Sequence, residues 1–322
     1  KTFSFIFFDD ENDDLNFINE ITNQFSTDHH NFNFQNEDLL KNIIEIQSFH
    51  DEPFSDSSCL PLYVLSKKAS NFVKAAITGD GADEIFLGYT NWFSRINEII
   101  KYSKFSKNKF LSKAIFNFDF LNQSSLGKYF YLNNLNNESD IFNFTKSPFT
   151  LKKLVRLGLI DDYPSNLNFR KIDRVKLFEL FKYDIINNYL PSNILYKSDR
   201  MSMAHSLELR SPFLDKKLVE YSLTLNNHIN YENDTGKKIL RELLKEFRVS
   251  SKIYKRKKSG FGAPISKILS NKIVNEALKD MLFNKNAKIF KYINHIEVFK
   301  DLHLLDYKVW YYFIFELWLN SR

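Results

Sequence analysis

Hydrophobic and polar positions follow two alternating periods through the first ninety residues. Residues 2–8 (TFSFIFF) form an apolar, aromatic run that favours a buried strand, and residues 30–34 alternate like a second strand. Apolar positions at helical spacing follow each of them, over residues 15–25 and 39–49, and a further strand-like run covers residues 73–77. Strands and helices that alternate at this interval predict a parallel sheet covered by helices.

The pattern changes after about residue 100. Residues 101–182 are rich in Phe, Leu, Asn and Lys with scattered helical periodicity, and from about residue 175 onward the pattern is mostly helical. We therefore expect an α/β nucleotide-binding part over residues 1–100, incomplete at its N-terminus. A helical elaboration over 101–182 and a helical C-terminal part over 183–322 should follow.

Composition narrows the class of protein. A hydrophobic fraction of 43% and a charged fraction of 26% are typical of a soluble globular chain. Cys59 is the single cysteine, which excludes an internal disulfide and favours a buried packing role in a reducing compartment. His29 and His30 are the only clustered histidines, and neighbours on a strand face opposite sides, so a zinc site is not expected.

No run in the chain reaches the ~20 apolar residues that a membrane span needs. No signal-peptide pattern opens the sequence. We therefore expect a cytoplasmic protein without a membrane partner.

The net charge of +6 has its densest source in residues 237–258, where ten Lys or Arg stand against two Glu. Such a run can bind nucleic acid, form a solvated helix face, or close over a polyphosphate. Regularly spaced stacking aromatics are missing from it, so we do not expect a nucleic-acid partner.

Residues 78–89 (TGDGADEIFLGY) directly follow the strand-like run 73–77 and hold three acidic side chains behind two glycines. If a helix begins near Ala82, Asp80, Asp83 and Glu84 lie on one side of the loop and first turn. Three carboxylates there repel one another unless a cation lies between them, and Mg²⁺ takes oxygen ligands and bridges phosphates. The alternative is an acidic first turn favoured by the helix dipole.

A second candidate segment, residues 254–265 (YKRKKSGFGAPI), places four basic residues before Gly-Phe-Gly-Ala-Pro. Lysines on such a loop can follow phosphate charge that develops in a transition state. Spacing alone does not choose between Lys257 and Lys258.

A third segment, residues 198–215, combines a stripe of apolar positions with charges beside it. The stripe predicts a buried helical face and consists of Met201, Ala204, Leu207 and Leu209. The charges are expected to be paired, and they either hold the fold or bind a charged substrate; they are Asp199, Arg200, Glu208 and Arg210.

Six blocks occur in a fixed order along the chain: DEPFSDSS, GDGADEIFLGY, SDRMSMAHSLELRSPFLD, TGKKILRELL, RKKSGFGAPI and YKVWYYFIFELWL. Together they resemble the synthetase domain of the glutamine-hydrolysing asparagine synthetase family. The resemblance covers essentially the whole chain and is weakest between about residues 101 and 182.

This resemblance implies an ATP-pyrophosphatase fold, with helices on both faces of a parallel sheet and a mostly helical C-terminal part. It implies an enzyme that uses ATP and Mg²⁺ to activate the side-chain carboxylate of aspartate as an acyl-adenylate and releases pyrophosphate. Ammonia derived from glutamine then gives asparagine and AMP. The expected partners are these small molecules, a glutaminase domain and a second copy of the chain.

The resemblance also implies site residues. The ATP-binding positions are Phe5 near adenine, the backbone of Thr78 and Gly79, and Lys258 near the α-phosphate. Asp83 falls where an aspartate binds Mg²⁺, with Glu84 as a further ligand. Asp80 falls where an acidic residue handles the ammonia proton, so Asp80 and Lys258 are the predicted catalytic residues.

The sequence departs from the family pattern in several places. A pyrophosphate-binding loop of the type Ser-Gly-Gly-x-Asp-Ser and the glutaminase domain are missing from these residues, so we expect a piece of a longer protein that is inactive alone. Leu87 replaces a usual glycine and Ser57 a usual proline.

Two alternatives stay open from the sequence. The first is a related amidotransferase that acts on another carboxylate, such as a sugar uronate, or that closes β-lactam or lasso-peptide rings. The second is a degenerate, non-catalytic partner subunit.

Overall fold

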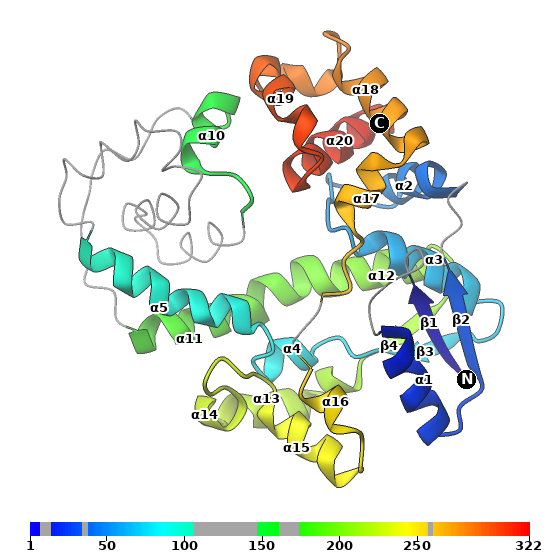
Figure 1. The fold of residues 1–322 in the computed structure, drawn as a ribbon, viewed down its shortest axis with the longest axis vertical. Helices are drawn as coiled ribbons and strands as arrows, with labels where there is room; N and C mark the ends of the chain where they lie inside the picture. Colours follow the sequence, from blue (N-terminus) through cyan, green and yellow to red (C-terminus); the bar gives the residue numbers. More distant parts are fainter. Residues whose placement is uncertain (7–13, 34–37, 106–146, 161–173, 257–259) are drawn as a thin grey trace.

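The computed structural model describes residues 1–6, 14–33, 38–105, 147–160, 174–256 and 260–322. It is an α/β structure that is mostly helical and contains small parallel sheets (Figure 1). The elements of the N-terminal third are β1 (Thr2–Ile6), α1 (Asp14–Gln24), β2 (His29–Asn33), α2 (Leu39–Ser48), α3 (Cys59–Ala69), β3 (Ala75–Ile77), α4 (Ala82–Ile85) and α5 (Thr90–Phe105).

The remaining described elements are nearly all helical. A π-helical segment covers Ile185–Leu195, and β4 (Glu208–Arg210) is a short strand within this part. The α-helices are α10 (Leu151–Leu157), α11 (Arg174–Asp184), α12 (Tyr196–Met203), α13 (Lys216–Thr224), α14 (Asn227–Asn230), α15 (Lys238–Glu246), α16 (Ser251–Tyr254), α17 (Ile265–Ser270), α18 (Lys272–Leu282), α19 (His295–Asp301) and α20 (Tyr307–Asn320).

Strand β1 pairs in parallel with β2, and successive side chains of this pair point to opposite faces of the sheet. On one face, the His29 ring bonds the hydroxyls of Thr2 and Ser4, each at 3.0 Å. On the other face, His30 stacks on Phe3 with ring centroids 5.5 Å apart. The prediction that the two histidines point to opposite faces is therefore confirmed.

Strand β3 pairs in parallel with β4, more than a hundred residues further along the chain. The predicted parallel pairing is thus confirmed, but the described residues form two separate two-stranded sheets and no ladder joins them. β4 also corrects an expectation, because the predicted helical stripe ends early. Helix α12 stops at Met203, and Leu209 lies in the strand. Met201 and Leu207 are nevertheless buried.

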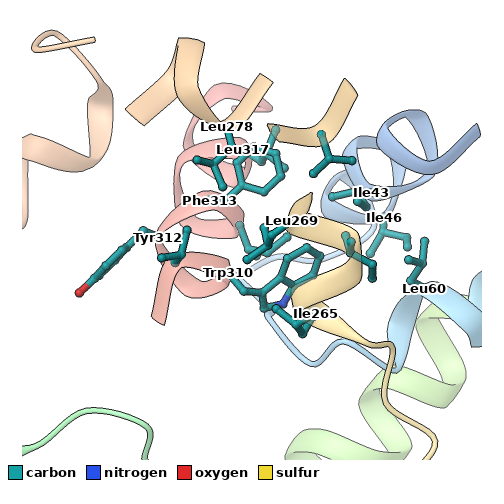
Figure 2. Packing of buried hydrophobic residues seen from close by; sticks show 14 of the residues in the cluster. Ile43, Ile46, Leu60, Ile265, Leu269, Leu278, Trp310, Tyr312, Phe313 and Leu317 are labelled. Atoms are coloured by element: carbon teal, nitrogen blue, oxygen red, sulfur yellow. The ribbon is translucent and has the colours of Figure 1, made fainter. Parts of the chain in front are cut away.

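The main hydrophobic core joins the two ends of the chain. Trp310 and Phe313 on α20 pack among Ile43 and Ile46 of α2 and Leu269 of α17 (Figure 2). The same cluster continues into α3 and β1. Within the described residues, none of the helices is both long and apolar enough to cross a membrane.

Two indole groups of α20 also hydrogen-bond to the loop that precedes α3. Trp310 Nε1 donates to the carbonyl oxygen of Ser55 at 2.8 Å, and Trp318 Nε1 donates to that of His50 at 3.2 Å. Each ring buries its apolar body while its N–H finds an acceptor. Residues 50–58 are in this way fixed against the C-terminal helix.

Candidate active site

The loop after β3 is held by β4. The Thr78 amide donates to the carbonyl oxygen of Arg210 at 2.9 Å, which continues the β3–β4 ladder by one residue. The Thr78 side chain lies 2.9 Å from Ser211 Oγ. Helix α4 then begins at Ala82, so the condition on which the carboxylate spacing was argued is met.

Two glycines, Gly81 just before α4 and Gly88 just after it, are required by close packing. Gly81 has φ +89°, and a Cβ there would lie 2.4 Å from Leu214 Cδ2. A Cβ at Gly88 would lie 1.8 Å from Asp83 Oδ1, so Gly88 leaves the room that the Asp83 carboxylate occupies. Gly79 differs from them, because a Cβ there would meet no atom within 4 Å.

Leu87 adopts the left-handed conformation, with φ +57°. This backbone explains why glycine suits the position, since a side chain there costs about 1–2 kcal/mol. The leucine side chain is buried, at 2% exposure, and this burial offsets the strain.

Asp80 is half-buried in the loop, and two hydroxyl groups donate to the same oxygen of its carboxylate. Ser198 Oγ on α12 donates to Oδ2 at 2.7 Å, and Thr78 Oγ1 donates to it at 3.2 Å. The carboxylate is therefore held from two elements, the β3 loop and α12.

Asp83 and Glu84 follow each other in α4 but have different surroundings. Asp83 Oδ1 lies 2.9 Å from the ammonium of Lys237, whose own backbone has φ +55° and donates to the carbonyl oxygen of Phe86. Glu84 is buried and accepts a hydrogen bond from the Tyr89 hydroxyl at 2.5 Å. Burial and the neighbouring Glu84 raise the pKa of Tyr89 far above its usual range.

A cleft of about 450 Å³ opens beside Asp83. Arg241 and Arg256 line it together with Lys237. The Arg241 guanidinium donates to the carbonyl oxygens of Gly236, Tyr254 and Arg256, so it stiffens the cleft wall. Arg256 pairs with Asp14 on α1. The uncharged residues that line the cleft are Leu240, Leu244, Ile253, Tyr254, Gly260 and Phe261.

Lys258, the predicted catalytic lysine, lies outside the described residues, which stop at Arg256 and resume at Gly260. Both of these flanking residues line the cleft. Phe5 is described: it is a buried residue of β1, opposite Phe32 in the register, and belongs to the main core.

The four charged candidates of the third segment do not converge on one point. Arg210 donates to Glu208 at 2.9 Å, and both side chains are exposed on β4. Arg200 pairs with Asp51 at 2.6 Å, while Asp199 is exposed on α12. Pairing is therefore confirmed for Arg200, Glu208 and Arg210, whereas a substrate-binding role stays a prediction.

An ion pair that the sequence did not single out involves Lys197, the residue before Ser198 on α12. The Lys197 ammonium lies 3.2 Å from Asp56 Oδ2 and donates to Ser58 Oγ at 2.6 Å, and Ser58 in turn donates to Asp56 Oδ1. Burial alone would raise the pKa of Asp56, but Lys197 and the Ser58 hydrogen bonds lower it below its ordinary value. The Asp-x-Ser spacing, typical of a local Asx turn, was the available signal.

Cys59 has a histidine neighbour that the sequence did not indicate, since His50 Nε2 lies 3.8 Å from its sulfur. Both groups are buried, and burial raises the pKa of the Cys59 thiol while it lowers that of His50 to about 4. A thiolate–imidazolium pair is thus disfavoured, and the packing role of Cys59 agrees with its buried position.

Comparison with known proteins adds a family match. The family described as asparagine synthase matches residues 1–320. Asparagine synthetase (glutamine-hydrolysing) 1 of Bacillus subtilis is 27% identical over 296 residues, which cover 88% of this chain and 46% of that protein. A Methanocaldococcus jannaschii protein, provisionally named asparagine synthetase (glutamine-hydrolysing) 2, is 32% identical over 63% of this chain and 39% of its own.

A third relative, asparagine synthetase (glutamine-hydrolysing) 3 of Bacillus subtilis, is 27% identical over 76% of this chain and 36% of its own length. The chain spans about half the length of the curated relatives it matches, or less.

Proposed function

Because the chain belongs to the asparagine synthase family, we propose that it forms the synthetase part of an ATP-dependent ligase that converts a carboxylate into an amide. The side-chain carboxylate of aspartate is the proposed substrate, and the names of the relatives support this choice. The observation that carries the proposal is the glycine-bounded loop after β3. The loop holds Asp80 between two hydroxyls, and α4 directly after it presents Asp83 to a cleft with basic walls.

The proposed fold is that of the ATP-pyrophosphatases, with β1–β2 and β3–β4 as parts of one nucleotide-binding sheet. Parallel pairing in both sheets supports it. Ile77 at the end of β3 is 78% exposed, which is unusual for a β-branched residue in a parallel sheet and fits a surface that further structure covers.

ATP is proposed to place its polyphosphate in the cleft beside Asp83. Lys237 and Arg256 supply positive charge there, and Lys258 follows Arg256 by two residues. Asp14 and Asp83 come from the N-terminal part of the chain, whereas Lys237 and Phe261 come from the C-terminal part. This supports the proposed organisation, in which residues 183–322 complete a cleft begun by residues 1–100.

Asp83 fits Mg²⁺, and the fit does not need Glu84. Its carboxylate is partly exposed at the cleft and already faces a cation, the Lys237 ammonium. Among the described residues, no three acidic, His or Cys side chains group as a metal site. A single carboxylate suits Mg²⁺, which keeps waters and phosphate oxygens as its other ligands. When bound, the ion would neutralise phosphate charge as pyrophosphate leaves.

The residues of the loop suggest how the reaction would proceed. The substrate carboxylate attacks the α-phosphorus of ATP, pyrophosphate leaves, and an acyl-adenylate remains. Ammonia, which the glutaminase domain of the complete protein would supply, attacks the acyl carbon and displaces AMP. Asp80 would accept the proton that the nitrogen must lose, because its carboxylate is ionisable, half-buried and fixed in place.

ATP–pyrophosphate exchange in the complete protein tests this proposal. We expect exchange that depends on aspartate and Mg²⁺, and we expect Asp83→Asn to lower its rate about a hundredfold or more, because a metal ligand is lost. Glu220→Gln, an exposed carboxylate on α13, is the matched control and should keep the parent rate. Exchange that depends on a different acid would show that this acid, not aspartate, is the substrate. Absence of exchange with any carboxylate would refute the proposed ligase function.

A further inference from the structure

The hydrogen bonds around Asp80 use one carboxylate oxygen and leave the other. Ser198 and Thr78 both donate to Oδ2. No side chain of the described residues hydrogen-bonds to Oδ1. The carboxylate is therefore asymmetric, with one oxygen anchored and one able to accept a further proton.

The hydrogen-bond network around Asp80 extends to Ser211. Each hydroxyl has one proton to donate, and Thr78 directs its proton to Asp80. Ser211, whose Oγ lies 2.9 Å from Thr78 Oγ1, must then donate to Thr78. The chain of donors therefore runs from Ser211 to Thr78 to Asp80 Oδ2. Ser198 donates to the same oxygen from α12.

The hydrogen bond from Ser198 to Asp80 is shorter than the one from Thr78, and its donor is held in place by neighbouring groups. Ser198 is buried on α12, at 6% exposure, next to Lys197. The Lys197 ammonium is fixed by Asp56 and Ser58 at the start of α3, which holds this turn of α12 in place. A short bond from a buried hydroxyl to a carboxylate is worth more than one between neutral groups.

We propose that Ser198 is a positioning residue for amide formation: its bond to Oδ2 turns Oδ1 of Asp80 toward the nitrogen that must lose a proton. This inference rests on the proposed ligase function. In the step concerned, the ammonia nitrogen bonds to the acyl carbon, the bond from that carbon to the AMP oxygen breaks, and one N–H proton passes to Oδ1. Adenylation needs no proton transfer to Asp80, so Ser198 acts on the second step alone.

The test compares Ser198→Ala with Ser198→Thr in the complete protein. Ammonia-dependent amide formation should fall about tenfold in kcat for Ser198→Ala, with the KM for ATP unchanged, because one charge-assisted hydrogen bond is lost. Ser198→Thr keeps a hydroxyl and should stay within about threefold of the parent. ATP–pyrophosphate exchange should persist in both variants at the parent rate.

Ser202→Ala provides the matched control. Ser202 is buried one turn further along the same helix, and its hydroxyl donates to the helix carbonyl of Asp199. We expect parent rates in both assays. A general disturbance of α12 would lower the rates of Ser202→Ala as well. Loss of the hydrogen bond from Ser198 to Asp80 would lower the rate of amide formation in Ser198→Ala alone.

The outcomes separate this inference from the function on which it rests. Exchange without any defect in amide formation for Ser198→Ala would overturn the role of Ser198 and keep the ligase. Equal losses in Ser198→Ala and Ser198→Thr would also overturn it, because the hydroxyl would then be irrelevant. Absence of exchange in the parent protein would instead overturn the proposed function.

Discussion

Gly88 shows how a single missing side chain shapes the candidate site. A Cβ at this position would lie 1.8 Å from Asp83 Oδ1 and 2.9 Å from Asp83 Cα, far inside van der Waals contact. The segment could therefore be recognised from its glycines, but their reasons differ. Gly81 is needed because its φ is positive and Leu214 packs closely against it. Gly88 is needed because a side chain there would overlap Asp83, whereas a side chain at Gly79 would meet open space.

Gly88→Ala should therefore displace Asp83 and destabilise the fold. We expect the free energy of unfolding to fall by about 1–3 kcal/mol, the usual cost of overpacking a tight site. Gly79→Ala is the matched control and should change it by no more than about 1 kcal/mol, because a methyl group fits there. Chemical denaturation measures both values, and equal stability of the two variants would contradict the packing argument.

At the scale of elements, α12 is positioned by a polar contact that periodicity does not reveal. Its Lys197 side chain reaches Asp56 and Ser58 at the start of α3, and both charged groups are largely buried. The apolar pattern did identify α1, α2 and both N-terminal strands, because their apolar positions recur at the helix and strand periods. It failed at Leu209, because α12 ends at Met203 and Leu209 lies in β4, where it pairs with β3.

Lys197→Met should leave Asp56 without its partner and lower the free energy of unfolding by about 2–3 kcal/mol at pH 7. The pKa of Asp56 is lowered in the fold, so its stabilising contribution is present above its unfolded pKa of about 4 and is lost as the pH falls through the folded value. The difference between parent and variant should therefore shrink below about pH 4.

Denaturation curves at pH 7 and at pH 3 give this difference directly. Lys216→Met, which removes an exposed i,i+4 pair with Glu220, is the control and should change stability by less than about 0.5 kcal/mol at either pH. A Lys197→Met deficit that stays constant with pH would show that packing, not the Asp56 charge, explains the loss.

On the scale of the whole molecule, the core connects parts that are far apart in sequence. Phe313 of α20 is fully buried in a cluster that includes Leu39 of α2 and Phe5 of β1. The C-terminal helix therefore stabilises the elements that lead to the candidate site. Sequence patterns predicted an α/β part and a helical part, but they did not predict that these parts share a core.

Phe313→Ala should lower the free energy of unfolding by about 3–5 kcal/mol, the cost of a large cavity. Because the core is shared, far-UV circular dichroism and tryptophan fluorescence should show one transition that shifts together. Phe247→Ala, at a ring that is 58% exposed, is the control and should leave the midpoint nearly unchanged. Separate transitions for the two signals would contradict a common core.

The sequence by itself determined the local elements and the segment from Thr78 to Tyr89 as the centre of the candidate site. Strand and helix periods, like the spacing of glycines and carboxylates, are properties of neighbouring residues. Only the tertiary structure decided which groups complete that site. Ser198 reaches Asp80 across 118 positions, Lys197 reaches Asp56 across 141, and Lys237 comes to Asp83 from α15's N-terminus. Hydrogen bonds and ion pairs act over about 3 Å, so their partners depend on how distant elements pack, which no local pattern records.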